Sequence, residues 1–292
     1  MYVGNTIQLT GTVNPSNTTE STLWTSSNTD VATVSDTGLV TAKSAGTATI
    51  TFKNSSGTMS ANCTITVEAY KEALETESYV GYYADVEGDG TVDGIIFADL
   101  LHGKTGQWGN SNGTYTIPTI ESTKVKSYKI SQEDYTNQLG GTSKILTPSG
   151  DGNDRFYIMA LTDIGTSKYS FGRSMSGSSM SGTMITFGSG KTNTQTLIGK
   201  AGVDVRLKGE IQPKVDKGWF IPSKDEWSAF VEELGITNGN YSDKGLMGGY
   251  WTSSENLTII LTPMGEILER WLYVHQQQHP RLCSLGHDFL IL

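Results

Sequence analysis

Alternating apolar and polar residues predict a series of short strands in the first part of the chain. Residues 7–13 alternate as a strand with one buried face does. Similar runs recur at intervals of roughly 8–12 residues, namely 22–25, 31–34, 38–41, 48–52 and 63–67. Turn-forming residues separate them, such as Asn14-Pro15 and Asp36-Thr37-Gly38. This spacing predicts an all-β sandwich over residues 1–70, with Trp24 as the core anchor between its two sheets.

A helical pattern follows much later, at residues 224–234. Ser223 is the expected N-cap, and Glu226 three residues later completes a capping box. Gly235 ends the helix. One apolar face is formed by residues at helical spacing: Trp227, Phe230, Val231 and Leu234. Asp225 and Glu226 are neighbours on a helix and cannot face each other across a substrate, so we assign them to the positive end of the helix dipole.

The rest of the second half mixes strands, glycine-rich loops and short helices. Residues 154–161 read as a buried strand, and 193–200 and 210–217 as short helices, the second broken or begun by Pro213. We therefore expect an α+β domain over residues 79–292. The short charged stretch before it, 71–78, is expected to be a linker.

An acidic loop follows this linker and resembles part of a calcium-binding loop. Carboxylates occupy loop positions 1, 3, 5 and 9, at Asp85, Glu87, Asp89 and Asp93. Gly90 stands where such a loop needs a sharp bend, but Ile96 stands in place of the bidentate glutamate, and no helix pattern precedes the loop. The alternative is a polar β-turn between residues 82–83 and 95–97. The calcium-binding pattern is thus incomplete, so calcium is a weak candidate, and no other cofactor is predicted.

Composition and charge indicate which kinds of partner and location are disfavoured for this protein. Of 292 residues, 36% are hydrophobic and 17% charged, 34 are glycine, and the net charge is −9. The net negative charge disfavours a nucleic-acid partner. No run of 18 apolar residues occurs, so the sequence does not predict insertion into a membrane. Residues 1–5 have neither the basic nor the apolar part of a secretory signal, so either no signal exists or the chain begins after it.

The two cysteines, Cys63 and Cys283, form no metal-binding motif. Buried or free thiols are favoured over a disulfide bridge between them.

The order of residues in the first module resembles the bacterial Ig-like group 2 domain. The resemblance covers nearly all of residues 1–70 and rests on five segments: 13–16, 23–28, 31–34, 38–42 and 46–50. It implies a spacer or adhesion module of the cell surface that performs no chemistry.

A second resemblance concerns the rest of the chain. Lys217-Gly218-Trp219-Phe220-Ile221-Pro222-Ser223 with the following helix start, and Gly249-Tyr250-Trp251-Thr252-Ser253-Ser254, resemble a C-type-lectin-like signature. This version occurs in relatives of formylglycine-generating enzymes and in the variable proteins of diversity-generating retroelements. Residues 80–85 and 96–100 resemble the start of the same domain in targets from phages and gut bacteria. The resemblance implies a compact α+β domain whose final strands and loops present a ligand-binding face. In the retroelement targets that last segment is rewritten by adenine-directed mutagenesis.

Several departures limit what this resemblance implies. Formylglycine-generating enzymes use a cysteine pair, but this domain holds only Cys283. The calcium triplets of sugar-binding lectins are missing as well. The tail fits the family loosely, through Gly265, residues 280–283 and Phe289, and Glu266 and Trp271 cannot arise by mutation of adenines in asparagine codons. If the glutamines at 276–278 are encoded by CAA, a one-base shift reads the mutable codon AAC, and the tail would be an out-of-frame variant.

The candidate ligand-binding residues lie in the expected variable segment, 255–281. They are Asn256, Leu257, Ile259, Glu266, Leu268, Arg270, Trp271, Tyr273, His275, Gln277 and His279. Arg270, Trp271, Tyr273 and His275 are residue types that supply binding hot spots. On a strand, either Trp271, Tyr273 and His275 or Arg270, Leu272 and Val274 face outward, and the first set is favoured.

Catalysis and metal binding find less support. His275 and His279 could share a helix face, but Pro280 ends that helix and no third ligand is evident, so no metal is assigned. Ser253 has no His–Asp partner in the pattern, which disfavours a hydrolase.

The sequence therefore predicts an N-terminal all-β Ig-like sandwich plus a C-terminal α+β C-type-lectin-like (formylglycine-generating-enzyme-like) domain. We expect a non-enzymatic protein on a cell surface or phage virion whose C-terminal face binds a cell-surface protein or glycan. Two alternatives stay open. One is a fixed fimbrial or structural adhesin without diversification, and the other is an enzyme related to the formylglycine-generating oxidases.

Overall fold

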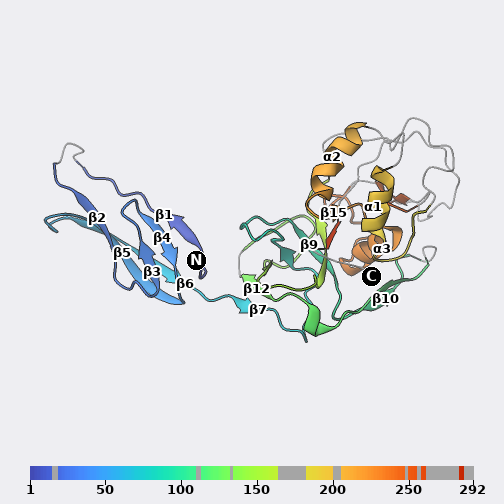
Figure 1. Cartoon of the computed structure of the whole chain (residues 1–292), viewed down its shortest axis with the longest axis horizontal. Helices are drawn as coiled ribbons and strands as arrows, with labels where there is room; N and C mark the ends of the chain where they lie inside the picture. Colours follow the sequence, from blue (N-terminus) through green and yellow to red (C-terminus); the bar gives the residue numbers. More distant parts are fainter. Residues whose placement is uncertain are drawn as a thin grey trace. The chain divides into compact units, whose positions relative to one another are not determined.

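The computed structural model divides the chain into two compact units, residues 1–71 and 72–292, which are shown in Figure 1 and treated separately below. The structure describes residues 1–14, 19–109, 113–131, 134–163, 182–199, 205–246, 249–254, 258–260 and 283–285. Within these ranges, no helix is long and apolar enough to cross a membrane.

The first unit is the expected β-sandwich. One sheet has the order β1 (Thr6–Gln8), β4 (Leu39–Ala42), β3 (Ala32–Val34), and the other β2 (Thr22–Ser26), β5 (Gly46–Asn54), β6 (Ser60–Val67). Small aliphatic side chains from both sheets form its core: Val31, Ala32, Val40, Ala42, Ala48, Ile50, Ile65 and Val67. Alternation along each strand places these residues on the inner faces, because successive side chains point to opposite sides of a sheet.

Two details of this unit differ from the prediction. The first strand ends at Gln8 instead of continuing to residue 13. Beyond it, Gly11 lies against the Phe52 ring, where a Cβ atom would come within 2.7 Å of ring carbons. Trp24, the predicted core anchor, is only half-buried. Its ring is tilted against that of Phe52 with centroids 4.6 Å apart, and it packs against the aliphatic core.

The second unit is built on an eight-stranded sheet. Its order is β15 (Trp219–Phe220), β18 (Cys283–Leu285), β14 (Phe156–Ala160), β9 (Gly94–Asp99), β8 (Tyr83–Ala84), β13 (Ile145–Pro148), β12 (Tyr128–Ser131) and β7 (Lys71–Glu72). Two hairpins lie outside it, β10 (Lys104–Gly106) with β11 (Tyr115–Ile117), and β16 (Gly249–Trp251) with β17 (Thr258–Ile260). The helical elements are η1 (Ser122–Lys124), α1 (Gly190–Ile198), α2 (Val205–Val215) and α3 (Lys224–Glu233).

The central strands of this sheet are covered on both faces. Every residue of β9 is buried. Ile95 and Phe97 join the cluster that contains Trp227 and Phe230 of α3, whereas Ile96 joins a separate cluster with Leu197 of α1 and Ile211 of α2. The adjacent strand β14 divides its side chains between the same two clusters. The predicted buried strand over residues 154–161 is therefore confirmed, with β14 at its centre.

The three α-helices match the sequence pattern to different degrees. Helix α3 has both halves of the predicted capping box, and Gly235 follows it at φ 60°. Helix α1 starts at Gly190, three residues before the prediction. Helix α2 starts five residues before its prediction and contains Pro213 in its last turn, so this proline neither begins the helix nor interrupts its middle. The helix ends two residues later, and the missing proline N–H therefore affects only its final turn.

The expected linker, 71–78, is bound to the second unit rather than free. The Ala73 N–H donates to the Tyr128 carbonyl at 2.8 Å. Arg155 is 2% exposed and donates to the carbonyls of Leu74 and Glu77. It also holds Asp99 through two 2.9 Å bonds. A buried guanidinium needs acceptors for its donors, and this segment supplies two of them beside the two that Asp99 supplies.

Candidate functional site

Most of the predicted ligand-binding residues fall outside the described part of the chain. These are Asn256, Leu257, Glu266, Leu268, Arg270, Trp271, Tyr273, His275, Gln277 and His279. Ile259 alone is placed, in strand β17, where its backbone pairs with Tyr250 of β16. Tyr250 is fully buried and stacks on Trp227 with centroids 4.8 Å apart. The start of the predicted segment therefore pairs with a strand that belongs to the core.

The residues just before this segment are anchored firmly. Thr252, Ser253 and Ser254 have at most 1% of their surface exposed. The Ser253 N–H donates to the Pro222 carbonyl at 2.8 Å, and the Lys224 N–H donates to Ser254 Oγ at 3.0 Å. These bonds join the chain at this point to the start of helix α3. The far end of the segment is followed by strand β18, which lies between β14 and β15.

Asn193 on helix α1 ties this anchor to a third segment. Its side-chain amide donates to the Met184 carbonyl at 2.6 Å and accepts from the Met184 N–H at 2.9 Å. The same amide donates to Ser253 Oγ at 3.3 Å. Ser254 Oγ also donates to the Met184 carbonyl, at 2.9 Å. One buried side chain thus holds residue 184 beside the base of the predicted segment.

Glu226 performs a similar function at the start of helix α3. Its carboxylate accepts the N–H of Ser223 at 2.6 Å and that of Gly188 at 3.1 Å. Complete burial raises the pKa of Glu226 to about 7, against the lowering effect of the donors at Ser223, Gly188 and Gly190. A Cβ atom at Gly190 would clash with this carboxylate and with the Phe220 ring, which explains the glycine there.

Together these side chains form what we call the polar platform. Its members are all at most 4% exposed: Ser189, Asn193, Ser223, Glu226, Ser253 and Ser254. Ser253 offers no accessible nucleophile, because it is fully buried and its Oγ accepts from Asn193. The platform is therefore suited to holding surface segments in place and not to chemistry on a substrate.

The surface above the platform carries two apolar side chains. Met184 is 55% exposed and Ile185 is 46% exposed. Their backbone is fixed from several sides, since the Ile185 carbonyl accepts from the Asp225 N–H at 3.0 Å in addition to the bonds on Met184. Sequence reasoning missed this pair and Asn193, because no local pattern shows that Asn193 binds Met184, and Ser254 lies 70 residues away in the chain.

The acidic loop does not gather its carboxylates. Asp85 accepts the N–H groups of Gly88, Asp89 and Gly90, and Asp93 accepts that of Val86. Glu87 pairs instead with Lys217 at 2.7 Å. No group of three or more acidic, histidine or cysteine side chains that could hold a metal occurs among the described residues. The loop is thus a turn stabilised by its own carboxylates, which corresponds to the alternative reading of its sequence.

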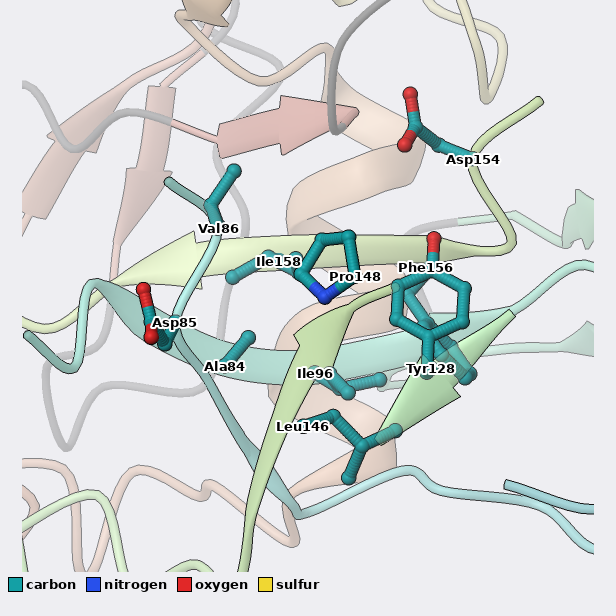
Figure 2. Close-up of a pocket in the computed structure, with 10 residues that line it drawn as sticks. All are labelled: Ala84, Asp85, Val86, Ile96, Tyr128, Leu146, Pro148, Asp154, Phe156 and Ile158. Atoms are coloured by element: carbon teal, nitrogen blue, oxygen red, sulfur yellow. The ribbon is translucent and has the colours of Figure 1, made fainter. Parts of the chain in front are cut away.

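Figure 2 shows a small hollow beside this loop. Asp85 and Asp154 lie at its two sides, with the apolar side chains of Ile96, Leu146 and Ile158 between them. Both carboxylates have structural partners, since Asp85 binds its own loop and Asp154 pairs with Lys126 at 2.9 Å. The hollow therefore gives little support for a small-molecule site.

The structure describes the side chain of Cys63 but only the backbone of Cys283. Cys63 is a free, exposed thiol on strand β6. The backbone of Cys283 lies in strand β18, and its side chain is outside the described part.

Comparison with known proteins identifies the first unit. The family model of the bacterial Ig-like domain (group 2) matches residues 1–65. This confirms the resemblance expected for the first module, in a β-sandwich whose fold is generally non-catalytic. No curated protein matches the chain. The C-type-lectin-like resemblance of the second unit stays a prediction, on a β-rich domain with a few helices.

Proposed function

We propose that this chain is a ligand-recognition protein of a cell surface or phage virion. In this proposal the sandwich is a spacer, and a C-type-lectin-like domain presents residues 255–281 to a cell-surface protein or glycan. The segment is diversified, so that different copies recognise different ligands. No catalytic step and no cofactor is part of the proposal.

One observation carries this proposal. The chain is anchored by buried residues directly before residue 255, and it resumes in an interior strand of the sheet at residue 283. Such an arrangement supports a connecting segment that changes in sequence without loss of the core, because the described residues of the two core clusters of this unit lie outside it. The bacterial Ig-like match supports the surface location, since domains of this family occur in surface proteins.

Sequencing codons 250–292 with their flanks across the source population tests the proposal. We expect variation concentrated at particular codons, beside a near-copy template and a reverse transcriptase gene. The same reads decide the reading frame, because CAG at codons 276–278 would exclude the frame-shift hypothesis. An invariant segment would overturn diversification and favour a fixed adhesin.

The spacer role of the first unit has its own test. A chain without residues 1–70 should bind cells of the source community as well as the full chain does, measured with fluorescently labelled protein. Loss of binding by a well-folded deletion variant would show that the sandwich takes part in recognition. An assay for oxidation of a cysteine-containing peptide addresses the enzymatic alternative, and turnover there would overturn the proposal.

A further inference from the structure

Strand β6 is the outer strand of the sheet β2-β5-β6 in the sandwich, and it pairs with β5 along its whole length, Ser60–Val67. The Ser27 N–H, just after β2, donates to the Thr49 carbonyl at 2.9 Å, so the odd-numbered residues of β5 face β2 and the even-numbered ones face β6. Even-numbered residues of β5 lie opposite odd-numbered residues of β6. The even-numbered residues of β6 therefore direct their N–H and C=O groups away from the sheet.

One end of this outer edge already binds another segment of the chain. The amino group of Met1 donates to the Thr66 carbonyl at 2.9 Å, and the Glu68 N–H donates to the Met1 carbonyl at 2.9 Å. The Val3 N–H in turn donates to the Glu68 carbonyl at 3.1 Å. Thr66 and Glu68 are even-numbered, as the alternation requires. The outward groups at this end of β6 are thus bound by backbone groups of an added segment.

The remaining stretch, Ser60 to Thr64, forms what we call the open edge. All of its residues are exposed. Within the described part of the chain, no hydrogen bond reaches the outward backbone groups of Ser60, Asn62 and Thr64. Edge strands are usually protected from further pairing by charged residues, proline, bulges or short length. Strand β6 has 8 residues with neither charge nor proline, and its register with β5 is unbroken. It therefore has none of these protections.

From this geometry we propose that the open edge pairs with the same stretch of a second copy of this chain, antiparallel and centred on Asn62. A two-fold axis at Asn62 places Ser60 opposite Thr64 of the second copy. Outward-facing residues that lie directly opposite each other in an antiparallel pair exchange both of their hydrogen bonds. The paired stretch ends at Thr64 on each copy, before Thr66, where Met1 is bound. The two sheets thereby join into one continuous sheet.

A second copy fits this edge because the open edge is its own complement. Its three outward residues are arranged symmetrically about Asn62, so two identical stretches match in length and leave no outward group between them without a partner. No charge lies in the stretch, so the two-fold axis brings no like charges opposite each other. Symmetric dimers use the same patch on both subunits in this way. The pairing does not depend on the proposed function.

The test traps the pair by disulfide formation in the full chain, because so short a stretch should pair only weakly in dilute solution. Residue 61 of one copy lies opposite Cys63 of the other in a non-hydrogen-bonded pair, whose Cα separation of about 4.5 Å suits a disulfide. The variant A61C/C63S is mixed with the unchanged chain in a glutathione redox buffer. Covalent dimers are followed on non-reducing gels, and mass spectrometry identifies the linked residues.

Links between positions 61 and 63 should form at least about tenfold faster than links from a control variant, because pairing raises the local concentration of the two thiols. The control is D36C/C63S, whose new cysteine lies in an exposed turn of the sandwich. Links that form no faster than those of the control would overturn the inference, and would mean that another segment or an unlike protein covers the edge.

Substitutions at Asn62 show whether the strand that binds is the same strand. Asn62→Lys in both chains places like charges opposite each other and should slow the link by about two- to fivefold. Asn62→Lys in one chain with Asn62→Asp in the other should restore the rate, because opposite charges then meet. Equal rates for every combination at residue 62 would overturn the pairing centred there.

Thr64→Pro blocks the edge itself. It removes an N–H that points away from β5, a position where a strand tolerates proline. The link should form at least about fivefold more slowly, because one hydrogen bond is lost from each copy. Circular dichroism and thermal melting check that the variant is folded. If it melts early, the substitutions at Asn62 decide the question, and an unchanged rate in a folded Thr64→Pro variant would refute strand pairing.

Discussion

The two units of this chain use opposite means to become stable. The sandwich has a core of small aliphatic residues, and none of its described polar side chains is fully buried. The second unit packs large aromatic residues and also buries Arg155, Asp99, Glu226 and Asn193. Strand pairing satisfies most of the backbone in the first unit. In the second unit, side chains also bind the backbone of irregular described segments such as residues 184–188.

The difference between the two cores indicates which substitutions each unit tolerates. An aliphatic core depends on the volume and pattern of its side chains, so many combinations of apolar residues can form it. A buried hydrogen-bonded network depends on every partner, because a single orphaned group is costly. The second unit therefore concentrates its sensitivity in a few polar side chains and leaves the surface above them open to variation.

The largest expected effect comes from Arg155→Met. It leaves the Asp99 carboxylate buried without its partner and releases the carbonyls of Leu74 and Glu77. Breaking a buried ion pair from one side costs about 3–5 kcal/mol in the free energy of unfolding. Urea unfolding followed by tryptophan fluorescence measures it, since Trp24 is the one tryptophan in residues 1–71.

The matched control for Arg155 is Lys124→Met. Lys124 pairs with Glu121 at 2.9 Å, but both side chains are mostly exposed. Surface pairs contribute little because water screens them, so this variant should unfold like the unchanged chain. Equal losses from both substitutions would contradict the special role of the buried pair.

The second prediction concerns pH. Because burial raises the pKa of Glu226 from its usual value of 4.5 to about 7 in the folded state, the folded protein retains a proton that the unfolded chain releases. The contribution of Glu226 to the free energy of unfolding should thus be complete below pH 4.5 and fall by about 3 kcal/mol as pH rises to 7. In Glu226→Gln this contribution should vanish. Comparing urea unfolding of the two proteins from pH 4 to 8 isolates it.

Glu121→Gln serves as the control for the pH series, because Glu121 is an exposed carboxylate paired with Lys124. It should retain the pH dependence of the unchanged chain. If Glu226→Gln does so too, the carboxyl of Glu226 does not titrate in this range.

A smaller loss is expected for Asn193→Ala. The substitution removes the acceptor of the Met184 N–H, whereas the Met184 carbonyl keeps its bonds from Ser189 and Ser254. An unsatisfied donor of this kind costs about 1–3 kcal/mol. Asn62→Ala in the sandwich removes an exposed bond to Thr51 and should change stability by less than about 0.5 kcal/mol. Thermal melting of both variants makes the comparison, and the reverse order would contradict it.

The smallest effect is expected for Cys63→Ser. The thiol is exposed on strand β6, so its replacement should change the free energy of unfolding by less than about 0.5 kcal/mol. In the folded unchanged chain, Cys63 should react with a thiol reagent as fast as an unstructured peptide does. Protection of this thiol would mean that strand β6 is covered.

Local patterns predicted the local elements well. The capping box at Ser223 and Glu226, the apolar face of helix α3 and most sandwich strands follow from residues close together in the chain. The bounds of helix α2 were predicted wrongly. The sequence pattern indicated residues 210–217, whereas the helix spans Val205–Val215. Trp24 was predicted to anchor the core between the two sheets, and it packs against the aliphatic cluster while staying only half-buried.

Partners distant in sequence could not be predicted. Nothing near Arg155 reveals that it binds Asp99 and the residues expected as a linker. The bond from Ser254 to Met184, 70 residues apart, likewise depends on the tertiary fold. In the Asp85 loop, spacing typical of metal ligands accompanies carboxylate bonds to the loop's own amides, which the spacing alone does not predict. The spacing of polar residues in the sequence indicates which side chains lie near one another, but it does not show which groups they bind by hydrogen bonds.

The position of strand β18 has a consequence for synthesis of the protein. Its residues 283–285 are translated long after β14 and β15, yet they lie between these two strands in the sheet. The sandwich can complete both of its sheets once Val67 has left the ribosome. The sheet of the second unit is complete only when nearly the whole chain has been made, and until then β14 and β15 each lack the partner strand that lies between them.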